Sequence, residues 1–212
     1  MRMKTVYFVR HGESEGNVEN ISQGPDSKLT DKGKEQALFI ADRCTRLSID
    51  RVVSSTFERA RHTAEMISER TGSPHDTSEL FIERRKPSEQ RGRPKDDPEA
   101  ARIERVIGEN FHIPEYRFSD EENFEDLKDR ARRAFEFLEE QKENSIVVVT
   151  HGYFIRVLGA YLLFGDELTA QECRSAVAAF RITNTGLTVA EYDEEKEPQW
   201  RLVTWNDHAH LG

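Results

Sequence analysis

The sequence predicts an α/β fold in which helices pack against a mainly parallel sheet. Two apolar runs rich in β-branched residues, at residues 5–9 and 146–149, are typical of buried strands. Segments with apolar residues at helical spacing lie between and after them. Because strands that alternate with helices build layered folds with parallel sheets, we expect one such domain over residues 1–212.

The first half of the chain contains two helices and a second short strand. Residues 31–47 place apolar side chains at helical spacing and predict a helix. Residues 49–54 contain paired valines and predict a strand. Residues 57–70 predict another helix, which ends at the Thr-Gly-Ser-Pro sequence of residues 71–74 because Gly and Pro disfavour its continuation.

The second half contains two more helices and three late strands. Residues 123–142 are amphipathic and predict a long helix, and residues 153–164 predict a helix directly after the strand at 146–149. Late strands are predicted at residues 176–182, 187–192 and 200–205. The last of these strands are expected to add a hairpin or an antiparallel edge to the sheet.

Charge and composition exclude several classes of protein. The 212 residues carry 31 Lys and Arg against 40 Asp and Glu, a formal charge of −9, so we expect no nucleic-acid partner. The longest stretch without these residues is 144–155, too short for a membrane span of ~20 residues. We expect no signal peptide, no disulfide framework from Cys44 and Cys173, and a cytoplasmic location. The sequence does not indicate an oligomeric state.

Two His-Gly pairs carry the chemical signal. His11-Gly12 and His151-Gly152 each follow a predicted strand, and ligands of α/β sheets bind at the carboxyl ends of strands. Arg10 precedes the first pair, and Arg59 and Arg61 lie near the start of the helix at 57–70. Guanidinium groups match phosphate oxygens, and a neutral imidazole can attack phosphorus. These residues therefore favour a phosphoryl site over two unrelated structural histidines.

The same residues belong to a longer pattern. It comprises Val-Arg-His-Gly-Glu-Ser-Glu-Gly-Asn at 9–17, Leu-Thr-Asp-Lys-Gly at 29–33, Val-Ser-Ser-Thr-Phe-Glu-Arg-Ala-Arg-His-Thr-Ala at 53–64 and Val-Thr-His-Gly at 149–152. This order of motifs resembles the histidine phosphatase superfamily, also called the phosphoglycerate mutase-like family, and its phosphatase branch. The resemblance implies a three-layer α/β/α sandwich, with a variable, lid-like segment at about residues 80–122.

The resemblance also implies roles for individual residues. His11 would be the nucleophile that becomes phosphohistidine, Arg10 and Arg59 would bind the phosphate oxygens, His151 would stabilise developing charge, and Asn17 would donate a hydrogen bond to the phosphoryl group. Fixed positive donors suit phosphoryl transfer, so we expect no metal and no cofactor. His11 must be neutral to attack, and a hydrogen bond from its other ring nitrogen to a backbone carbonyl, such as that of Gly12, would fix its tautomer.

The leaving oxygen needs a proton, which a carboxyl group in the variable segment supplies in this family. Glu83, in Leu-Phe-Ile-Glu-Arg, resembles the Leu-Asn-Glu-Arg sequence of the mutases and is the preferred donor. Glu89 is the alternative, and both glutamates could instead belong to a solvated charged loop.

A basic run follows Glu83. Residues 84–95 hold six basic side chains against Glu89, in a protein that is otherwise acidic. The run is either a solvated surface loop or a lid that attracts an anionic substrate. The lid interpretation favours a substrate with a second negative group.

The expected activity is hydrolysis of a small phosphorylated metabolite through phosphohistidine on His11. The alternative is a cofactor-dependent phosphoglycerate mutase, in which the phosphoryl group returns to a bound acceptor. Two observations disfavour the mutase. Arg85-Lys86-Pro87 replace the His-Tyr-Gly that follows Glu-Arg in the mutases, and this chain is shorter than typical mutases. A non-catalytic phosphate-binding relative is a third possibility, which the intact histidine and arginine set disfavours. His208 and His210 have the spacing of metal ligands but lack a third ligand, so a structural role is preferred.

Overall fold

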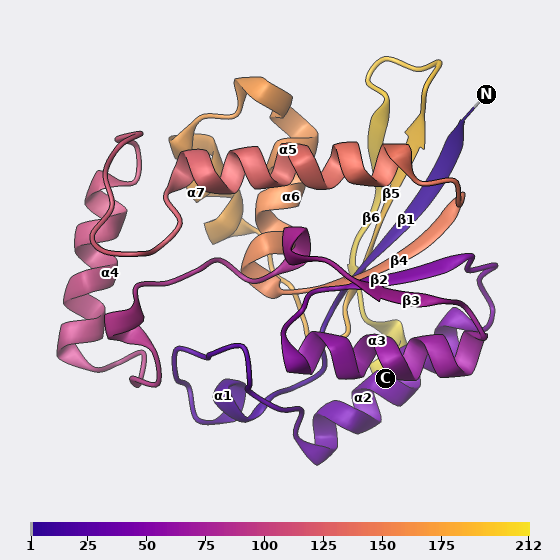
Figure 1. Ribbon diagram of the computed structural model, residues 1–212, viewed down its shortest axis with the longest axis horizontal. Coiled ribbons are helices and arrows are strands. Elements are labelled where there is room, and N and C mark those ends of the chain that lie inside the picture. Colours follow the sequence, from indigo (N-terminus) through magenta and orange to yellow (C-terminus); the bar gives the residue numbers. More distant parts are fainter. Residues whose placement is uncertain (1) are drawn as a thin grey trace.

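A six-stranded sheet organises the computed structural model, which describes residues 2–212 (Figure 1). The strands are β1 (Met3–Arg10), β2 (Arg51–Ser54), β3 (His75–Thr77), β4 (Ser145–Thr150), β5 (Leu187–Asp193) and β6 (Trp200–Asp207). Their order is β3-β2-β4-β1-β5-β6. The first four are paired in parallel, whereas β5 pairs antiparallel with both β1 and β6. The sheet is therefore mainly parallel with an antiparallel edge, as predicted.

Helices cover both faces of this sheet (Figure 1). Helices α5 (Phe124–Glu140), α6 (Gly152–Phe164) and α7 (Ala170–Ala179) cover one face, and α2 (Asp31–Cys44) and α3 (Glu58–Thr71) cover the other. The remaining helices are α1 (Glu15–Val18) and α4 (Pro98–Asn110). Alternation along each strand divides the core, because successive side chains point to opposite faces. Val6 and Phe8 pack with α5, α6 and α7, whereas Val9 packs with α2 and α3. The result is the three-layer α/β/α sandwich that the sequence predicts.

Two parts of the chain differ from the sequence prediction. The prediction of a strand at residues 176–182 is wrong, because residues 170–179 form helix α7. Thr169 and Glu172 cap the start of this helix, each accepting a hydrogen bond from the backbone N–H of the other. The short apolar run near residue 176 suits either a strand or a buried helix, and here it packs against the core as a helix.

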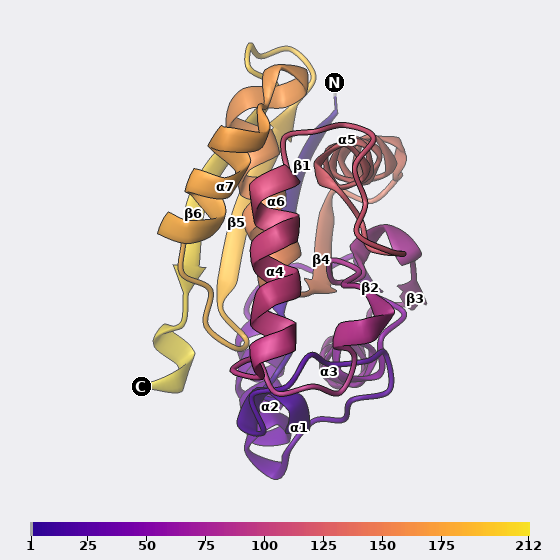
Figure 2. The same ribbon diagram turned by 90° about the vertical axis from the view of Figure 1, so that its left-hand side faces the viewer.

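Helix α4 was not predicted, and it lies within the segment between α3 and α5. Asp97 caps it by accepting hydrogen bonds from the N–H groups of Glu99 (3.0 Å) and Ala100 (2.9 Å), and Pro98 occupies its first turn. Figure 2 shows α4 in front of α6. Arg174 of α7 donates a hydrogen bond to the carbonyl of Gly108 in α4, at 2.6 Å. Within residues 2–212, no helix combines the length and apolar character needed to cross a bilayer.

Candidate active site

The two His-Gly pairs lie side by side because of the strand pairing. Arg10 at the end of β1 is opposite Thr150 at the end of β4, so the residues that follow both strands are neighbours. The ring centroids of His11 and His151 are 5.1 Å apart, and both side chains are buried. The sheet edge thus brings together two histidines that are far apart in the sequence, as expected.

His11 has the hydrogen bonds of a neutral imidazole. Its Nδ1 lies 2.7 Å from the Gly12 carbonyl oxygen and donates to it, which is the contact expected from the sequence. Its Nε2 then accepts from Arg59 Nε at 3.2 Å. Burial, then the nearby Arg59 and Arg10 guanidinium groups, hold the pKa of His11 well below its usual value of 6.5. The Nε2 lone pair is therefore available at neutral pH.

Arg59 connects the two histidines. It lies in the first turn of α3, is almost fully buried, and donates through Nη2 to His151 Nδ1 (3.2 Å) and through Nη1 to the Gly24 carbonyl (2.9 Å). Burial lowers the pKa of Arg59 to about 10, so the guanidinium group stays charged at neutral pH. Arg59 Nε and Nη2, which contact the two imidazole rings, are therefore placed to donate hydrogen bonds to a phosphoryl group on His11.

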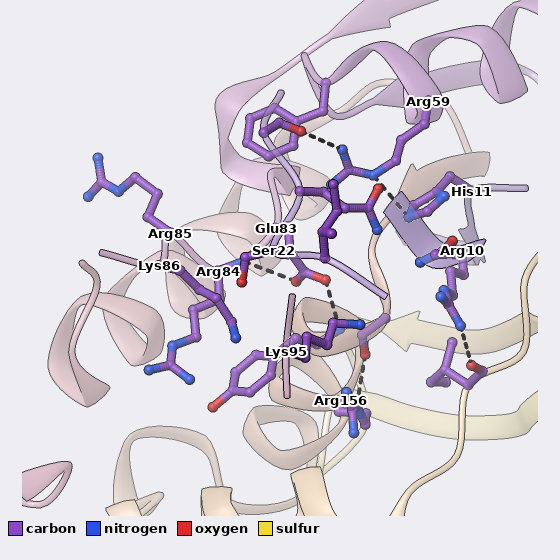
Figure 3. Close-up of a pocket in the computed structure, with 18 of the residues that line it drawn as sticks. Arg10, His11, Ser22, Arg59, Glu83, Arg84, Arg85, Lys86, Lys95 and Arg156 are labelled. Carbon is purple, nitrogen blue, oxygen red and sulfur yellow. Dashed lines mark hydrogen bonds between the residues drawn. The ribbon is translucent and has the colours of Figure 1, made fainter. Parts of the chain in front are cut away.

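Arg10 supplies a second cation beside His11 (Figure 3). Its Nη1 donates to the Ile182 carbonyl at 2.8 Å, whereas its buried Nε has no hydrogen-bond partner among residues 2–212. A Cβ on Gly152 would lie 3.3 Å from this Nε, so the glycine of the second His-Gly pair leaves space for the guanidinium group. A buried N–H without a partner is costly, and an anion in the pocket would satisfy it.

His151 is also held neutral. Its Nδ1 accepts from Arg59, and its Nε2 lies 2.8 Å from Ser55 Oγ. Burial and then Arg59 hold the pKa of His151 well below 6.5. Because the Ser55 hydroxyl can accept from Nε2–H or donate to Nε2, His151 can switch tautomer and present Nδ1–H to an anion.

Asn17 lies in α1, where its side chain caps the helix start and lines the pocket. Its Oδ1 accepts from the Ser14 N–H (3.2 Å) and from Asn184 Nδ2 (3.3 Å). Asn17 Nδ2 forms no hydrogen bond to another residue in the described part of the chain. The amide therefore has donors left for a ligand, which is what the sequence-based expectation requires.

The Glu83 carboxylate lies at the N-terminus of α6 and lines the same pocket as His11 (Figure 3). Its Oε1 accepts from the N–H groups of Arg84 (3.0 Å) and Phe154 (3.1 Å), and its Oε2 accepts from that of Tyr153 (3.2 Å). Each carboxylate oxygen offers about two lone pairs, so Oε2 is the oxygen that retains one for a proton.

A buried ion pair braces the backbone on both sides of Glu83. Arg130 of α5 donates to both carboxylate oxygens of Glu122, at 2.7 and 2.8 Å. Arg130 also donates to the Leu80 and Ile82 carbonyls, and Glu122 accepts from the Arg85 N–H. Nothing in the sequence singled out Arg130 or Glu122, since they lie 48 and 37 residues beyond the backbone groups that they hold.

Glu89, the alternative proton donor, occupies a different position. Its side chain is exposed, it does not line the pocket, and its Oε2 accepts from the neighbouring Ser88 hydroxyl at 3.4 Å. The geometry therefore favours Glu83 over Glu89.

The pocket has a volume of about 790 Å³ and a cationic lining. Besides Arg10 and Arg59, its basic residues are Arg84, Arg85, Lys86, Arg91, Lys95, Arg156 and Arg181, against the acidic Glu83 and Asp120. Figure 3 shows Lys95 extending toward Glu83, whereas Arg85 points away from His11. Five of the six basic residues of the 84–95 run line the pocket, so the run is more than a solvated loop.

Three members of the run are paired with carboxylates. Arg93 does not line the pocket and instead lies 3.6 Å from Asp97. Arg84 is buried, and its Nη1 donates to Glu104 of α4 at 3.1 Å, where Lys86 also binds. This pair of contacts attaches α4 to the pocket wall.

The two late histidines do not form a metal site. His210 Nε2 lies 3.0 Å from Thr185 Oγ1 and its Nδ1 lies 3.4 Å from Arg43 Nη1, which is a structural role. His208 is exposed at the pocket rim. Among residues 2–212, no three His, Cys, Asp or Glu side chains are arranged to hold a metal ion.

Comparison with known proteins gives the same assignment as the motifs. The family model described as "Histidine phosphatase superfamily (branch 1)" matches residues 6–208. A relative from Citrobacter koseri, described as "Probable phosphoglycerate mutase GpmB", is 30% identical over 99% of this chain and 95% of its own.

Two solved structures share the fold. The YhfR protein of Bacillus stearothermophilus superposes with a TM-score of 0.82 at 25% identity, over 99% of this chain and 100% of its own. A mycobacterial glucosyl-3-phosphoglycerate phosphatase superposes with a TM-score of 0.77 at 24% identity, over 98% of this chain and 100% of its own. With the family model covering nearly the whole chain, the protein belongs to the histidine phosphatase superfamily.

Proposed function

We propose that this protein is a phosphomonoesterase that hydrolyses a small phosphorylated metabolite through a phosphohistidine on His11. One observation carries the proposal. His11 is buried and neutral, donates through Nδ1 to the Gly12 carbonyl, and directs its Nε2 lone pair at the Arg59 guanidinium group. An unprotonated ring nitrogen beside a fixed cation suits attack on an anionic phosphorus centre.

The first step transfers the phosphoryl group to the enzyme. Arg10, Arg59 and Asn17 bind its oxygens, and His11 Nε2 attacks phosphorus. As the N–P bond forms, the bond between phosphorus and the ester oxygen breaks. Glu83 Oε2 gives its proton to that oxygen, which leaves as an alcohol. His151 takes the tautomer with Nδ1–H and donates to a phosphoryl oxygen as charge develops.

The second step returns the enzyme to its starting state. Water enters where the alcohol has left. The water oxygen attacks phosphorus while the Glu83 carboxylate accepts a proton from the water. The P–N bond breaks, inorganic phosphate leaves, and His11 Nε2 recovers its lone pair while Nδ1–H stays on the Gly12 carbonyl.

The lining of the pocket supports a substrate with a second anionic group. Arg85, Lys86, Arg91 and Lys95 line the pocket in addition to the two arginines beside His11, so the non-phosphoryl part of an ester would meet further cations. Such a substrate could carry a carboxylate or a second phosphate, since both match these cations.

Phosphoglycerate mutase activity is the second candidate, and the Citrobacter koseri relative favours it. A mutase passes the phosphoryl group of the same phosphohistidine to a bound acceptor rather than to water. The cationic pocket would hold a bisphosphorylated intermediate as well as a monoester with a second charge, so assays must separate the two.

The test measures both products. Inorganic phosphate release is followed for a panel of phosphorylated metabolites, and interconversion of 3- and 2-phosphoglycerate is followed with and without a bisphosphate primer. Hydrolysis well above any mutase rate supports the proposal, and primer-dependent interconversion as the dominant reaction assigns the mutase.

A labelling experiment tests the nucleophile. The wild type should form an acid-labile, alkali-stable phosphoryl adduct within one turnover, and His11→Ala should form none and lose turnover. His62→Ala is the matched control, because His62 is half-buried on α3, does not line the pocket, and has its Nε2 3.9 Å from Glu58. An adduct that persists in His11→Ala contradicts the assignment.

A further inference from the structure

The turn at residues 182–186, which leads into β5, binds the end of β1. The turn forms three hydrogen bonds with Arg10. The Ile182 carbonyl accepts from Arg10 Nη1 at 2.8 Å, the Thr185 N–H donates to the Arg10 carbonyl at 2.9 Å, and the Gly186 carbonyl accepts from the Arg10 N–H at 3.3 Å. The turn thereby fixes both the backbone and the guanidinium group of Arg10.

Asn184 extends this contact to the other phosphate-binding groups. Its Nδ2 donates to the His11 carbonyl at 3.0 Å and to Asn17 Oδ1 at 3.3 Å. The Ser14 hydroxyl also lies 2.9 Å from Asn17 Oδ1, but it lies 2.7 Å from Gln23 Oε1 and has one proton for both. Asn184 is therefore a steady donor that keeps Asn17 Oδ1 engaged and leaves Asn17 Nδ2 for a ligand.

The backbone of this turn is strained. Thr185 is fully buried and has a φ of 57°, in the left-handed region that β-branched residues avoid. Its hydroxyl donates to the Asn184 carbonyl at 2.8 Å and lies 3.0 Å from His210 Nε2, in the last turn of the chain. Strained residues persist where surrounding structure holds them, and they cluster at functional sites. Here the strain accompanies the placement of the Asn184 amide between two parts of the site.

We infer that Asn184 is a positioning residue of phosphoryl transfer: it sets the orientation of the Asn17 amide. The inference rests on the proposed function, in which Asn17 Nδ2 donates to the phosphoryl group. Without the Asn184 donor, Asn17 Oδ1 keeps only the Ser14 N–H at 3.2 Å and the Ser14 hydroxyl that it shares with Gln23. The amide is then held less firmly and can present Oδ1, which repels phosphoryl oxygens. Asn184 itself does not touch the substrate and acts through Asn17.

A double-mutant cycle tests this dependence. Asn184→Ala, Asn17→Ala and the double variant are compared with the wild type by the rate of phosphoenzyme formation from p-nitrophenyl phosphate in a single turnover. Asn184→Ala should slow this step about tenfold in the wild type and less than about twofold in the Asn17→Ala background, since a residue that acts through another has nothing left to position. KM should change little.

Two further variants separate positioning from loss of structure. Asn110→Ala is the matched control, because Asn110 Nδ2 donates to the Val106 carbonyl in α4 and the residue does not line the pocket; its rate should match the wild type. Asn184→Asp keeps the side-chain volume and, when ionised, cannot donate. It should be folded by thermal melting and at least as slow as Asn184→Ala, and it replaces that variant in the cycle if Asn184→Ala melts below the assay temperature.

The outcomes are distinct. Equal fold losses in both backgrounds, or wild-type rates in both Asn184 variants, overturn the inference. If the wild type forms no phosphoenzyme, the proposed function fails, and the same cycle is read from the Kd of inorganic phosphate by calorimetry. In that readout the Asn184 variants must still weaken binding only where Asn17 is present, and multiplicative losses overturn the inference.

Discussion

At the scale of single residues, the leaving oxygen of an alkyl ester needs a proton, and the proposed mechanism assigns its donation to Glu83. Glu83→Gln removes the proton but keeps the side-chain shape. It should slow phosphoenzyme formation from an alkyl phosphate by about 10²–10⁴ and from p-nitrophenyl phosphate far less, because p-nitrophenolate leaves without a proton. Single-turnover rates for both substrates make the comparison, since hydrolysis of the intermediate would otherwise mask it.

Glu89→Gln is the control for this comparison and should slow neither substrate, because Glu89 is exposed and outside the pocket. Equal losses on the two substrates in Glu83→Gln would make Glu83 a substrate-binding residue instead. A selective loss in Glu89→Gln would assign the proton to Glu89.

The residues next to strand ends were predictable and the supporting residues were not. His11 and His151 follow β-branched runs, and strand pairing alone places them together. Asn184 contacts groups 173 and 167 residues away in the sequence, and Arg130 contacts carbonyls 50 and 48 residues away. Local patterns carry no information about such contacts, because tertiary packing creates them.

Among the elements, the start of α2 fixes the loop that carries His11. Thr30 caps this helix by accepting from the Gly33 N–H at 3.0 Å. A Cβ on Gly33 would lie 1.9 Å from the Glu13 carbonyl oxygen, and one on Gly12 would lie 2.3 Å from the Gly33 carbonyl oxygen. Only two facing glycines allow this approach, which explains why both motifs contain one.

Gly33→Ala should therefore displace the loop at residues 11–13. We expect phosphoenzyme formation to slow at least tenfold, about 1.4 kcal/mol in the barrier, together with a lower Tm. Gly108→Ala is the matched control, since Gly108 lies within α4 with no atom near its Cβ position. It should keep full activity and gain up to about 1 kcal/mol in stability. Unchanged activity in Gly33→Ala would contradict the role given to the glycine pair.

The elements that sequence reasoning missed had signals that competed with others. Helix α4 has an Asp-Pro start and buried Ala100, Ile103 and Ile107 at helical spacing, but it follows a polar run that suggests a loop. Helix α7 contains an apolar stretch that suits either structure, and only its capping pair favours a helix. Burial against α6 and the core determines the outcome, which depends on the assembled fold.

At the scale of the whole molecule, the buried neutral histidines His11 and His151 make the free energy of unfolding depend on pH. The folded-state pKa values of His11 and His151 lie well below the value of 6.5. Below about pH 6.5 the unfolded chain therefore binds more protons than the folded one. The stability that these histidines contribute is complete above pH 6.5 and is lost as the pH falls toward the folded-state pKa values.

The expected loss is about 1.4 kcal/mol per buried histidine for each pH unit below about 6.5. Urea unfolding between pH 7.5 and 5.5 should show it, and His11→Ala should reduce the slope. His75 and His210 shift in the same direction, so the difference between variants isolates His11. Lowered carboxyl pKa values, as at Glu104, act at lower pH. Equal slopes in the wild type and His11→Ala would contradict the prediction.

The contrast between an acidic protein and a cationic pocket predicts a dependence on salt. The chain carries a formal charge of −9, yet basic side chains outnumber acidic ones around the pocket. Exposed charges are screened beyond ~10 Å at 0.1 M salt but act over ~30 Å at 0.01 M. For a substrate with two anionic groups, kcat/KM should fall about tenfold between 0.01 and 1 M salt, because the local field raises its encounter rate.

Two matched double variants identify the source of this field. Arg85→Gln with Arg91→Gln removes two exposed cations that line the pocket, and it should flatten most of the salt dependence while kcat for a small monophosphate stays nearly unchanged. Arg93→Gln with Arg102→Gln removes the same net charge from side chains that do not line the pocket and that pair with Asp97 and Glu99. This control should retain the wild-type slope. If both double variants flatten the slope equally, net charge rather than the pocket attracts the substrate, and if neither does, the arginines of the 84–95 run do not steer it.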